Sequence, residues 1–192
     1  MLTQRYADAL QLAWRLHDGQ VRKGTTIPYV SHLIAVSSLA LEHGANEDEA
    51  IAALLHDAME DAGGRPTLEH IRQRFGPTVA DIVEGCTDSH EDPKPPWRQR
   101  KQAYLLHLGS ASPSVRLVSN ADKLHNARSI RSDLRVHGAA LWSRFTAGRE
   151  GTLWYYRSLV HAFAGHGRSP LVDELELTVT ELEAMAGLTP AP

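Results

Sequence analysis

The sequence predicts an all-α protein, a single domain of about nine or ten helices over residues 1–192. Three observations favour this fold. Apolar residues recur at the three- and four-residue spacing of amphipathic helices along most of the chain. No segment alternates polar and apolar side chains for long enough to require a strand. No internal repeat or long linker divides the 192 residues, which suffice for one sizeable core.

Residues with capping or helix-breaking chemistry bound the predicted helices. Ser31 and Asn46 carry side-chain oxygens that can accept hydrogen bonds from backbone N–H groups at helix starts, and Gly44 ends the helix between them. The polar, proline-containing stretches 20–29 and 88–96 predict loops. We therefore expect helices over 2–17, 31–43, 47–61, 67–76, 77–87, 97–108 and 113–136, one or two more within 141–163, and a C-terminal helix over 171–186.

Composition narrows the class of protein. The formal net charge is −3 and the pI is near 6.4, which argues against a general nucleic-acid binder. Cys86 is the single cysteine, so an internal disulfide and a cysteine-rich zinc module are excluded. The charged N-terminal segment does not resemble a signal peptide, and no apolar run is long enough to cross a bilayer. We expect a cytoplasmic protein without a membrane partner.

The segment 52–61 carries the clearest chemical pattern. His56 and Asp57 follow an apolar run, so their side chains should emerge from a buried helix, where unpaired charge is costly. Adjacent residues on a helix point about 100° apart, and both can therefore reach one metal ion. Glu60 and Asp61 lie about one turn further along, where carboxylates can handle the proton of an attacking water. The alternative is a hydrogen-bonded polar pair in the core.

A histidine–aspartate dipeptide is weak evidence by itself, and the chain contains a second one. His17 and Asp18 precede Gly19 at a predicted helix end, with no acidic residue one turn on. We interpret this second pair as a solvated helix terminus.

Three further groups can complete a site. Asp122 and Asn126 share one helical face, where an aspartate can join an octahedral ligand set and an asparagine can bind a sugar hydroxyl or phosphate; a solvated surface helix is the alternative. Arg22 and Lys23 lie in a glycine-containing loop that can meet phosphate or a base. His32 falls in the first turn of a predicted helix, where a capping or core histidine is the more common role.

Taken together, these segments resemble the HD hydrolase domain of the RelA/SpoT-type stringent-response enzymes, and most closely the stand-alone small alarmone hydrolases. The resemblance spans about residues 5–165, in family order and spacing. The matching segments are HDGQVRKG (17–24), IPYVSH (27–32), LHDAMED (55–61), VEGCTD (83–88), ADKLHNAR (121–128) and TLWYY (152–156). Leu33 departs from the proline common in the family, which should change helix entry and not the ligand.

The resemblance implies a function for each group. The implied metal ligands are His32, His56, Asp57 and Asp122, usually for one Mn²⁺, although such ligands also suit Fe²⁺, Mg²⁺ or Zn²⁺. Glu60 and Asp61 would orient and deprotonate the attacking water. The implied substrate contacts are Arg22 and Lys23 for the base, and Asn126 and Tyr156 for the ribose. Separately, the basic residues around Arg100 and Lys101 either neutralise the substrate's phosphates or form a solvated charge run.

The resemblance therefore implies an enzyme that removes the 3′-diphosphate from (p)ppGpp or (p)ppApp and releases pyrophosphate. Its partner would be a purine nucleotide, and the protein would be a monomer or homodimer. We expect no attached synthetase domain. Two alternatives remain open: an HD-family phosphatase for another nucleotide, such as NADPH, and a non-catalytic HD module that binds a nucleotide. The second would be expected to lack a ligand or an acid, whereas this sequence retains them all.

Overall fold

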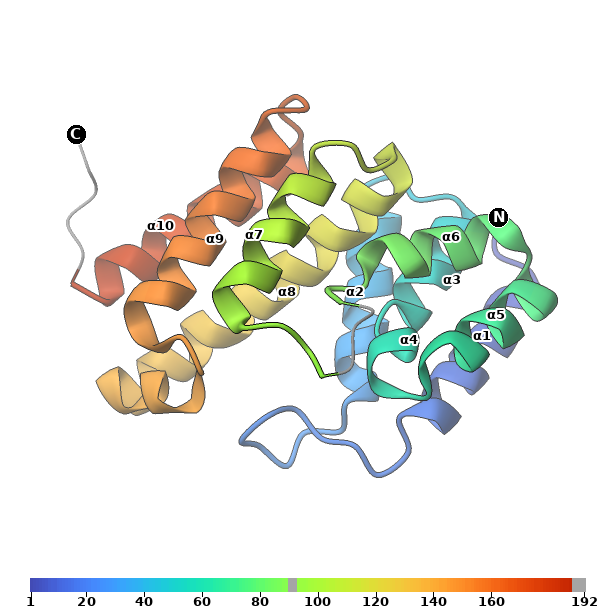
Figure 1. The fold of residues 1–192 in the computed structure, drawn as a ribbon, viewed down its shortest axis with the longest axis horizontal. Coiled ribbons are helices and arrows are strands. Elements are labelled where there is room, and N and C mark those ends of the chain that lie inside the picture. Colours follow the sequence, from blue (N-terminus) through green and yellow to red (C-terminus); the bar gives the residue numbers. More distant parts are fainter. Residues whose placement is uncertain (90–92, 188–192) are drawn as a thin grey trace. The chain divides into compact units, whose positions relative to one another are not determined.

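The computed structural model describes residues 1–89 and 93–187, and within them it confirms an all-α fold. Within the described residues, β-type pairing is limited to one isolated antiparallel bridge between Val21 and Pro28. The helices, shown in Figure 1, are α1 (Gln4–Leu16), α2 (Val30–Glu42), α3 (Glu47–Leu55), α4 (Ala58–Asp61), α5 (Gly64–Phe75), α6 (Pro77–Cys86), α7 (Trp97–Leu108), α8 (Pro113–His137), the 3₁₀ helix η1 (Gly138–Arg144), α9 (Gly148–Ala164) and α10 (Pro170–Met185).

The helices form two compact units. Unit 1 comprises Met1–Lys94 and Ala111–Asp122, and unit 2 comprises Pro95–Ser110 and the chain from Lys123 onward. The long helix α8 contributes its first part to unit 1 and the remainder to unit 2. That these units constitute one domain stays a prediction.

Unit 1 is built around α3. Its segment from Ala50 to Leu55 is completely buried, because α1, α2 and α6 all pack against it. A helix that is apolar on every side is expected at such a central position. Of the two predicted caps, the one at Asn46 is present: the Asn46 side chain accepts from the Glu49 backbone, and the Glu49 side chain accepts from the Asn46 backbone. The prediction of Ser31 as a cap was wrong, because α2 already begins at Val30 and has no side-chain cap bond.

The prediction of one helix over 47–61 was wrong, because the helix is interrupted between α3 and α4. His56 keeps helical angles, but Asp57 has φ −94° and ψ −5°, which leaves the regular helix. The two residues therefore lie in the turn between α3 and α4 and not within a continuous helix.

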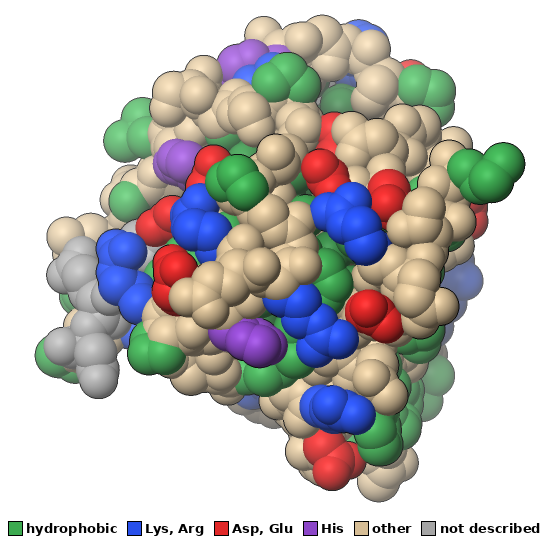
Figure 2. Space-filling view, turned by 90° about the vertical axis from the view of Figure 1, so that its right-hand side faces the viewer, with side chains coloured by type: hydrophobic (Ala, Val, Ile, Leu, Met, Phe, Trp, Pro, Cys, Tyr) green, Lys and Arg blue, Asp and Glu red, His purple; other side chains and the backbone are tan. Residues whose placement is uncertain are grey.

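The helix predicted over 67–76 begins earlier, at Gly64. Gly63 precedes it with φ 112°, a left-handed conformation that favours glycine, and Pro66 falls in the first turn, where a missing N–H costs nothing. The outer helices α5 and α6 carry ion pairs such as Arg72–Asp81 and Arg65–Glu84. Figure 2 shows a face on which acidic and basic side chains are intermixed.

Unit 2 has its own core, in which α9 packs against both α7 and α10. Leu159, Leu175 and Leu182 are completely buried there. Trp97 of α7 contacts Tyr155 of α9, with ring centroids 6.0 Å apart. None of the helices described here combines the length and the apolar character needed to cross a bilayer.

Candidate metal centre

Four side chains from three separate parts of the sequence come together in unit 1. His32 lies in the first turn of α2, His56 and Asp57 in the turn after α3, and Asp122 within α8. His32 Nε2 lies 3.2 Å from Asp122 Oδ1 and 3.6 Å from Asp57 Oδ2. His56 Nε2 lies 3.0 Å from Asp57 Oδ2 and 3.6 Å from Asp122 Oδ1. The structure thus places both imidazoles against both carboxylates.

The histidines present the nitrogen atoms that a metal would need. His56 Nδ1 lies 2.9 Å from the Ala53 carbonyl oxygen, which can only accept, so Nδ1 carries the proton. The lone pair of a neutral His56 then sits on Nε2, which is buried and forms no hydrogen bond of regular geometry within the described residues. That lone pair faces two carboxylate oxygens, an arrangement that only a cation between them makes favourable.

The donor set therefore fits a divalent metal ion. His32, His56 and Asp57 each offer a ligand atom, and these atoms lie within 4.8 Å of one another. Asp122 adds the fourth group at the distances given above. Imidazole nitrogen and carboxylate oxygen are the ligands of borderline and hard divalent ions.

In the absence of metal, the buried carboxylates favour a proton on the neighbouring histidine. Burial lowers the pKa of His56, but the Asp57 and Asp122 carboxylates outweigh burial and raise it well above its ordinary value. Burial raises the pKa of Asp57, but His56 and His32 outweigh that effect and hold it well below its ordinary value. A proton thus occupies the position that suits a metal cation.

The two predicted acids have different partners. Glu60 Oε1 pairs with Lys94 Nζ at 2.6 Å, and its Oε2 accepts from the Asp88 backbone N–H at 3.4 Å. Asp61 Oδ2 accepts from the neutral amide of Gln20 at 3.1 Å. Partial burial and the nearby Asp57 carboxylate raise the pKa of Asp61. Glu60 is thus paired with a cation, whereas the carboxylate of Asp61 meets a neutral amide.

Tyr29 is a site residue that the sequence analysis missed. Its hydroxyl donates to Asp57 Oδ2 at 2.6 Å. Burial first, and then the Asp57 carboxylate, raise the pKa of Tyr29 far above its ordinary value, so the phenol remains a donor. Its position three residues before His32 was a signal, because a first-turn residue and the residue before the helix can face the same site.

The interpretation of His17 as a solvated terminus was wrong. His17 is only 4% exposed, because its ring stacks on Tyr29 with centroids 5.1 Å apart. Its Nδ1 lies 2.7 Å from Gln20 Oε1. Asp18, in contrast, is exposed as expected. Local sequence could not reveal a stack formed by a residue twelve positions away.

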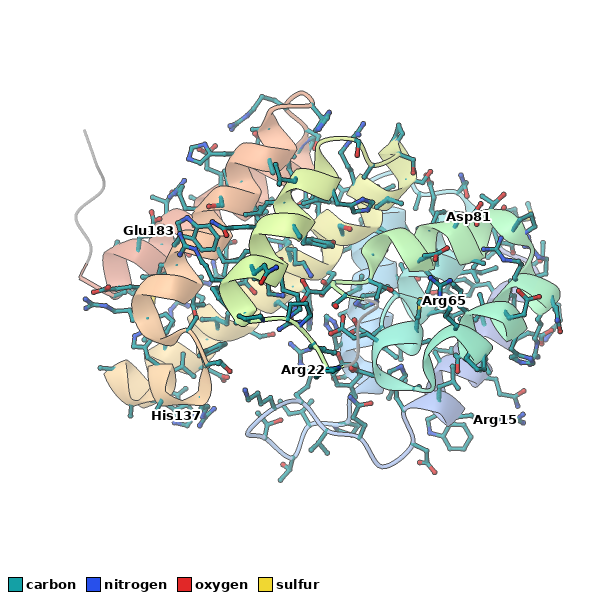
Figure 3. The ribbon with its side chains drawn as sticks, viewed as in Figure 1. Arg15, Arg22, Arg65, Asp81, His137 and Glu183 are labelled. Carbon is teal, nitrogen blue, oxygen red and sulfur yellow. The ribbon has the colours of Figure 1, made fainter. Side chains whose placement is uncertain are left out.

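The predicted base-contacting loop lies between α1 and α2, where Figure 3 labels Arg22. The guanidinium of Arg22 lies over the Tyr29 ring, 5.7 Å from its centroid, while Lys23 is exposed. The bridge between Val21 and Pro28 closes the loop around them.

The other predicted substrate contacts belong to unit 2. Asn126 lies one turn beyond Asp122 on α8, and Arg100 and Lys101 lie on α7. Tyr156 of α9 is only 7% exposed, and the Lys101 ammonium lies 4.9 Å from the centroid of the neighbouring Tyr155 ring. The substrate roles of these four residues stay predictions.

Comparison with known proteins agrees with this arrangement. A family model described as an HD domain matches residues 9–153. The guanosine-3′,5′-bis(diphosphate) 3′-pyrophosphohydrolase MESH1 of Xenopus tropicalis is 35% identical over 156 residues, which cover 76% of this chain and 84% of that protein. The bifunctional (p)ppGpp synthase/hydrolase SpoT of Escherichia coli is 31% identical over 178 residues, 90% of this chain and 24% of SpoT.

A solved structure supports the same grouping. It is that of a metazoan orthologue of SpoT that hydrolyses ppGpp, and it matches with a TM-score of 0.77 at 28% identity, covering 98% of this chain and 99% of that one. The family model spans the candidate ligands His32, His56, Asp57 and Asp122. This chain therefore belongs to the HD-domain family, in the branch that contains the (p)ppGpp 3′-pyrophosphohydrolases.

Proposed function

We propose that this chain is a metal-dependent phosphohydrolase that removes the 3′-diphosphate from a hyperphosphorylated purine nucleotide, (p)ppGpp or (p)ppApp. Water adds to the 3′-linked phosphorus, pyrophosphate leaves, and the 3′-hydroxyl is restored. The observation that carries the proposal is the buried cluster of two imidazoles and two carboxylates with two further acids beside it. The relatives named as (p)ppGpp hydrolases supply the substrate class.

His32, His56, Asp57 and Asp122 would hold the ion, for which we propose Mn²⁺. When bound, a divalent ion supplies Lewis acidity toward the phosphoryl group. The protein contributes the geometry: the carbonyl of Ala53 fixes the tautomer of His56, and the Tyr29 hydroxyl fixes one oxygen of Asp57.

Asp61 and Glu60 would act on the attacking water. A general base works best when its pKa approaches the working pH, and the raised pKa of Asp61 favours it as the proton acceptor. Glu60 would orient the water, since Lys94 and the Asp88 backbone already hold its carboxylate in place.

The substrate would be bound by residues outside the metal cluster. We propose that Arg22 and Lys23 contact the base, because the Arg22 guanidinium already lies over an aromatic ring and can stack on a purine in the same way. Asn126 and Tyr156 would contact the ribose, and Arg100 and Lys101 the phosphates. We propose that the enzyme acts in the cytoplasm, as a monomer or homodimer.

Incubation of the pure protein with Mn²⁺ and either ppGpp, ppApp or NADPH tests the proposal. The expected products are pyrophosphate and GDP or ADP, resolved by chromatography. Orthophosphate and NADH from NADPH, without pyrophosphate from the other two, would instead support the alternative nucleotide phosphatase. Tight nucleotide binding without turnover would support a non-catalytic module.

A further inference from the structure

Two side-chain contacts connect Asp61, through Gln20, to His17 at the end of α1. Gln20 Nε2 donates to Asp61 Oδ2 at 3.1 Å, and His17 Nδ1 lies 2.7 Å from Gln20 Oε1. An ionised carboxylate only accepts hydrogen bonds, so the amide nitrogen of Gln20 must face Asp61. Its oxygen then accepts from His17 Nδ1–H. A His17 tautomer that carries its proton on Nδ1 therefore matches the orientation in which the Gln20 amide nitrogen faces Asp61.

Both members of this pair are fixed by other contacts. The His17 ring is 4% exposed and lies nearly parallel to Tyr29, at an interplanar angle of 20°. The Gln20 backbone N–H donates to the His17 carbonyl at 3.0 Å, and the Gln20 carbonyl accepts from the Tyr29 backbone at 2.9 Å. Because main chain and side chain are both held, Gln20 presents its amide to Asp61 at a defined place.

Asp61 needs such support. It is the last residue of α4, which has only four residues and cannot fix a side chain by helix propagation alone. Gly63 and Gly64 follow at positive φ, so the chain turns away directly after it. The contact from Gln20 comes from a residue 41 positions away and ties this short helix to the end of α1.

We propose that Gln20, held by His17, is a positioning residue for Asp61. The inference rests on the function proposed above, in which Asp61 accepts the proton of the attacking water. Gln20 holds the Oδ2 end of the carboxylate and thereby fixes the direction in which Oδ1 points. The stack of His17 on Tyr29 extends the support to Asp57, which accepts from the Tyr29 hydroxyl. The stacked pair of His17 and Tyr29 thus supports both the acid and a candidate metal ligand.

The variant Gln20→Met tests this role, because methionine keeps the length of the side chain and removes the donor. We expect kcat to fall about tenfold or more, since a misplaced group costs up to a hundredfold, with KM changed less than about twofold. Bound Mn²⁺, measured by elemental analysis, should stay at the wild-type level. The matched control is Gln4→Met, which removes the same kind of bond, from Gln4 to Asp8 at 3.0 Å on the exposed surface of α1. It should behave as wild type.

A double variant separates positioning from a general structural effect. If Gln20 acts through Asp61, then Gln20→Met should cause no further loss of kcat in an Asp61→Ala background. A tenfold loss that persists in that background would overturn the proposal, as would unchanged kcat in the single variant.

A crystal structure of Gln20→Met decides the point independently of turnover. We expect the Asp61 carboxylate to leave its present position while the His32–Asp122 pair stays in place. An unmoved Asp61 would overturn the positioning role. Absence of turnover by the wild-type protein would refute the proposed function, but this structural outcome would still be readable.

Discussion

Two groups of charged side chains illustrate different uses of charge in this molecule. In unit 1, the cluster of His32, His56, Asp57 and Asp122 is largely buried. In unit 2, arginines on α8 and α9 and in the following turn pair with acids on α10 at the surface. These pairs are Arg128–Glu174, Arg131–Glu181, Arg157–Glu183, Arg157–Glu176, Arg168–Asp173 and Arg168–Glu176.

The difference lies in charge balance. Each guanidinium of the surface network is a permanent cation that meets carboxylates directly, so the network needs nothing further. In the buried cluster, two carboxylates face imidazoles that are neutral when unprotonated, so negative charge remains in a site of low polarity. A buried excess of carboxylate, and not the number of charged residues, is therefore what favours a metal ion at this cluster.

The largest effect should follow from removing a ligand of the buried cluster. We expect Asp57→Ala to lose Mn²⁺ and turnover together, by at least about a hundredfold, because loss of even an outer partner of a ligand costs 10–100-fold. Elemental analysis and steady-state kinetics on the same preparation measure both. The control is Asp81→Ala, which removes an exposed aspartate paired with Arg72. Full activity and full metal content in Asp57→Ala would refute the metal-site assignment.

A narrower effect, on turnover without loss of metal, should follow at the two acids. We expect Glu60→Gln and Asp61→Asn to keep Mn²⁺ and to lower kcat by about 10²–10⁴, the contribution typical of a positioned acid or base. Asp61→Asn should be the slower of the two, because Asp61 is the proposed proton acceptor, whereas Glu60 is proposed only to orient the water. Metal content and kcat are the measurements, and an unchanged kcat in both variants would contradict their proposed roles.

Much of the fold could be predicted because helix periodicity and caps are local. For example, Asn46 caps α3 as its side-chain chemistry predicts, in a capping box with Glu49. The break at Asp57 could not be predicted, since alanine, leucine, methionine and glutamate on either side all favour a helix. Helix propensity describes the average preference of a segment, so it cannot detect a single residue, such as Asp57, whose backbone departs from helical angles.

The site was predictable where residue types are unusual and hidden where they are ordinary. His56 and Asp57 stood out because they follow a buried apolar run, whereas His32 gained weight only from the family resemblance. Tyr29 and Gln20 escaped notice because each has a neutral side chain that donates to a carboxylate 28 or 41 residues away. Such pairs exist only after the helices have packed.

Removing the Tyr29 hydroxyl should weaken the buried cluster without dismantling it. In Tyr29→Phe the ring can still stack on His17, but Asp57 Oδ2 loses its donor. We expect Mn²⁺ affinity to fall about 10–100-fold, as for other partners of metal ligands. Metal titration followed by thermal denaturation measures this affinity, and an unchanged dissociation constant would show that the hydroxyl does not orient Asp57.

The pH dependence of the metal-free protein should show the same charge imbalance. The pKa of Asp57 is lowered, so its contribution to stability is present above about pH 4 and is lost as pH falls through the folded value. The pKa of His56 is raised, so its contribution is full below about pH 6.5 and is lost as pH rises through the folded value.

The stability advantage of metal-free wild type over Asp57→Asn should therefore be greatest between about pH 4 and 6.5 and shrink above that range. Stabilisation by Mn²⁺ should change in the opposite direction, rising with pH, because protons and metal compete for His56 Nε2. Denaturation with EDTA or with Mn²⁺ across this range measures both trends. If the stabilisation by Mn²⁺ did not change with pH, this result would contradict the idea that protons and metal compete for His56 Nε2.

The smallest effect should come from the surface network. Arg157 contacts Glu183 through two nitrogen atoms and also bonds Thr180, and its side chain is 28% exposed. We expect Arg157→Gln to lower the free energy of unfolding by about 1 kcal/mol or less, because such pairs are screened by solvent. For a chain of this size that corresponds to a Tm lower by about 2–4 °C. Metal content should not change, since the network balances its own charge and supplies no ligand. A loss of Mn²⁺ in this variant would mean that the two groups of charges are energetically linked, and the contrast between them would fail.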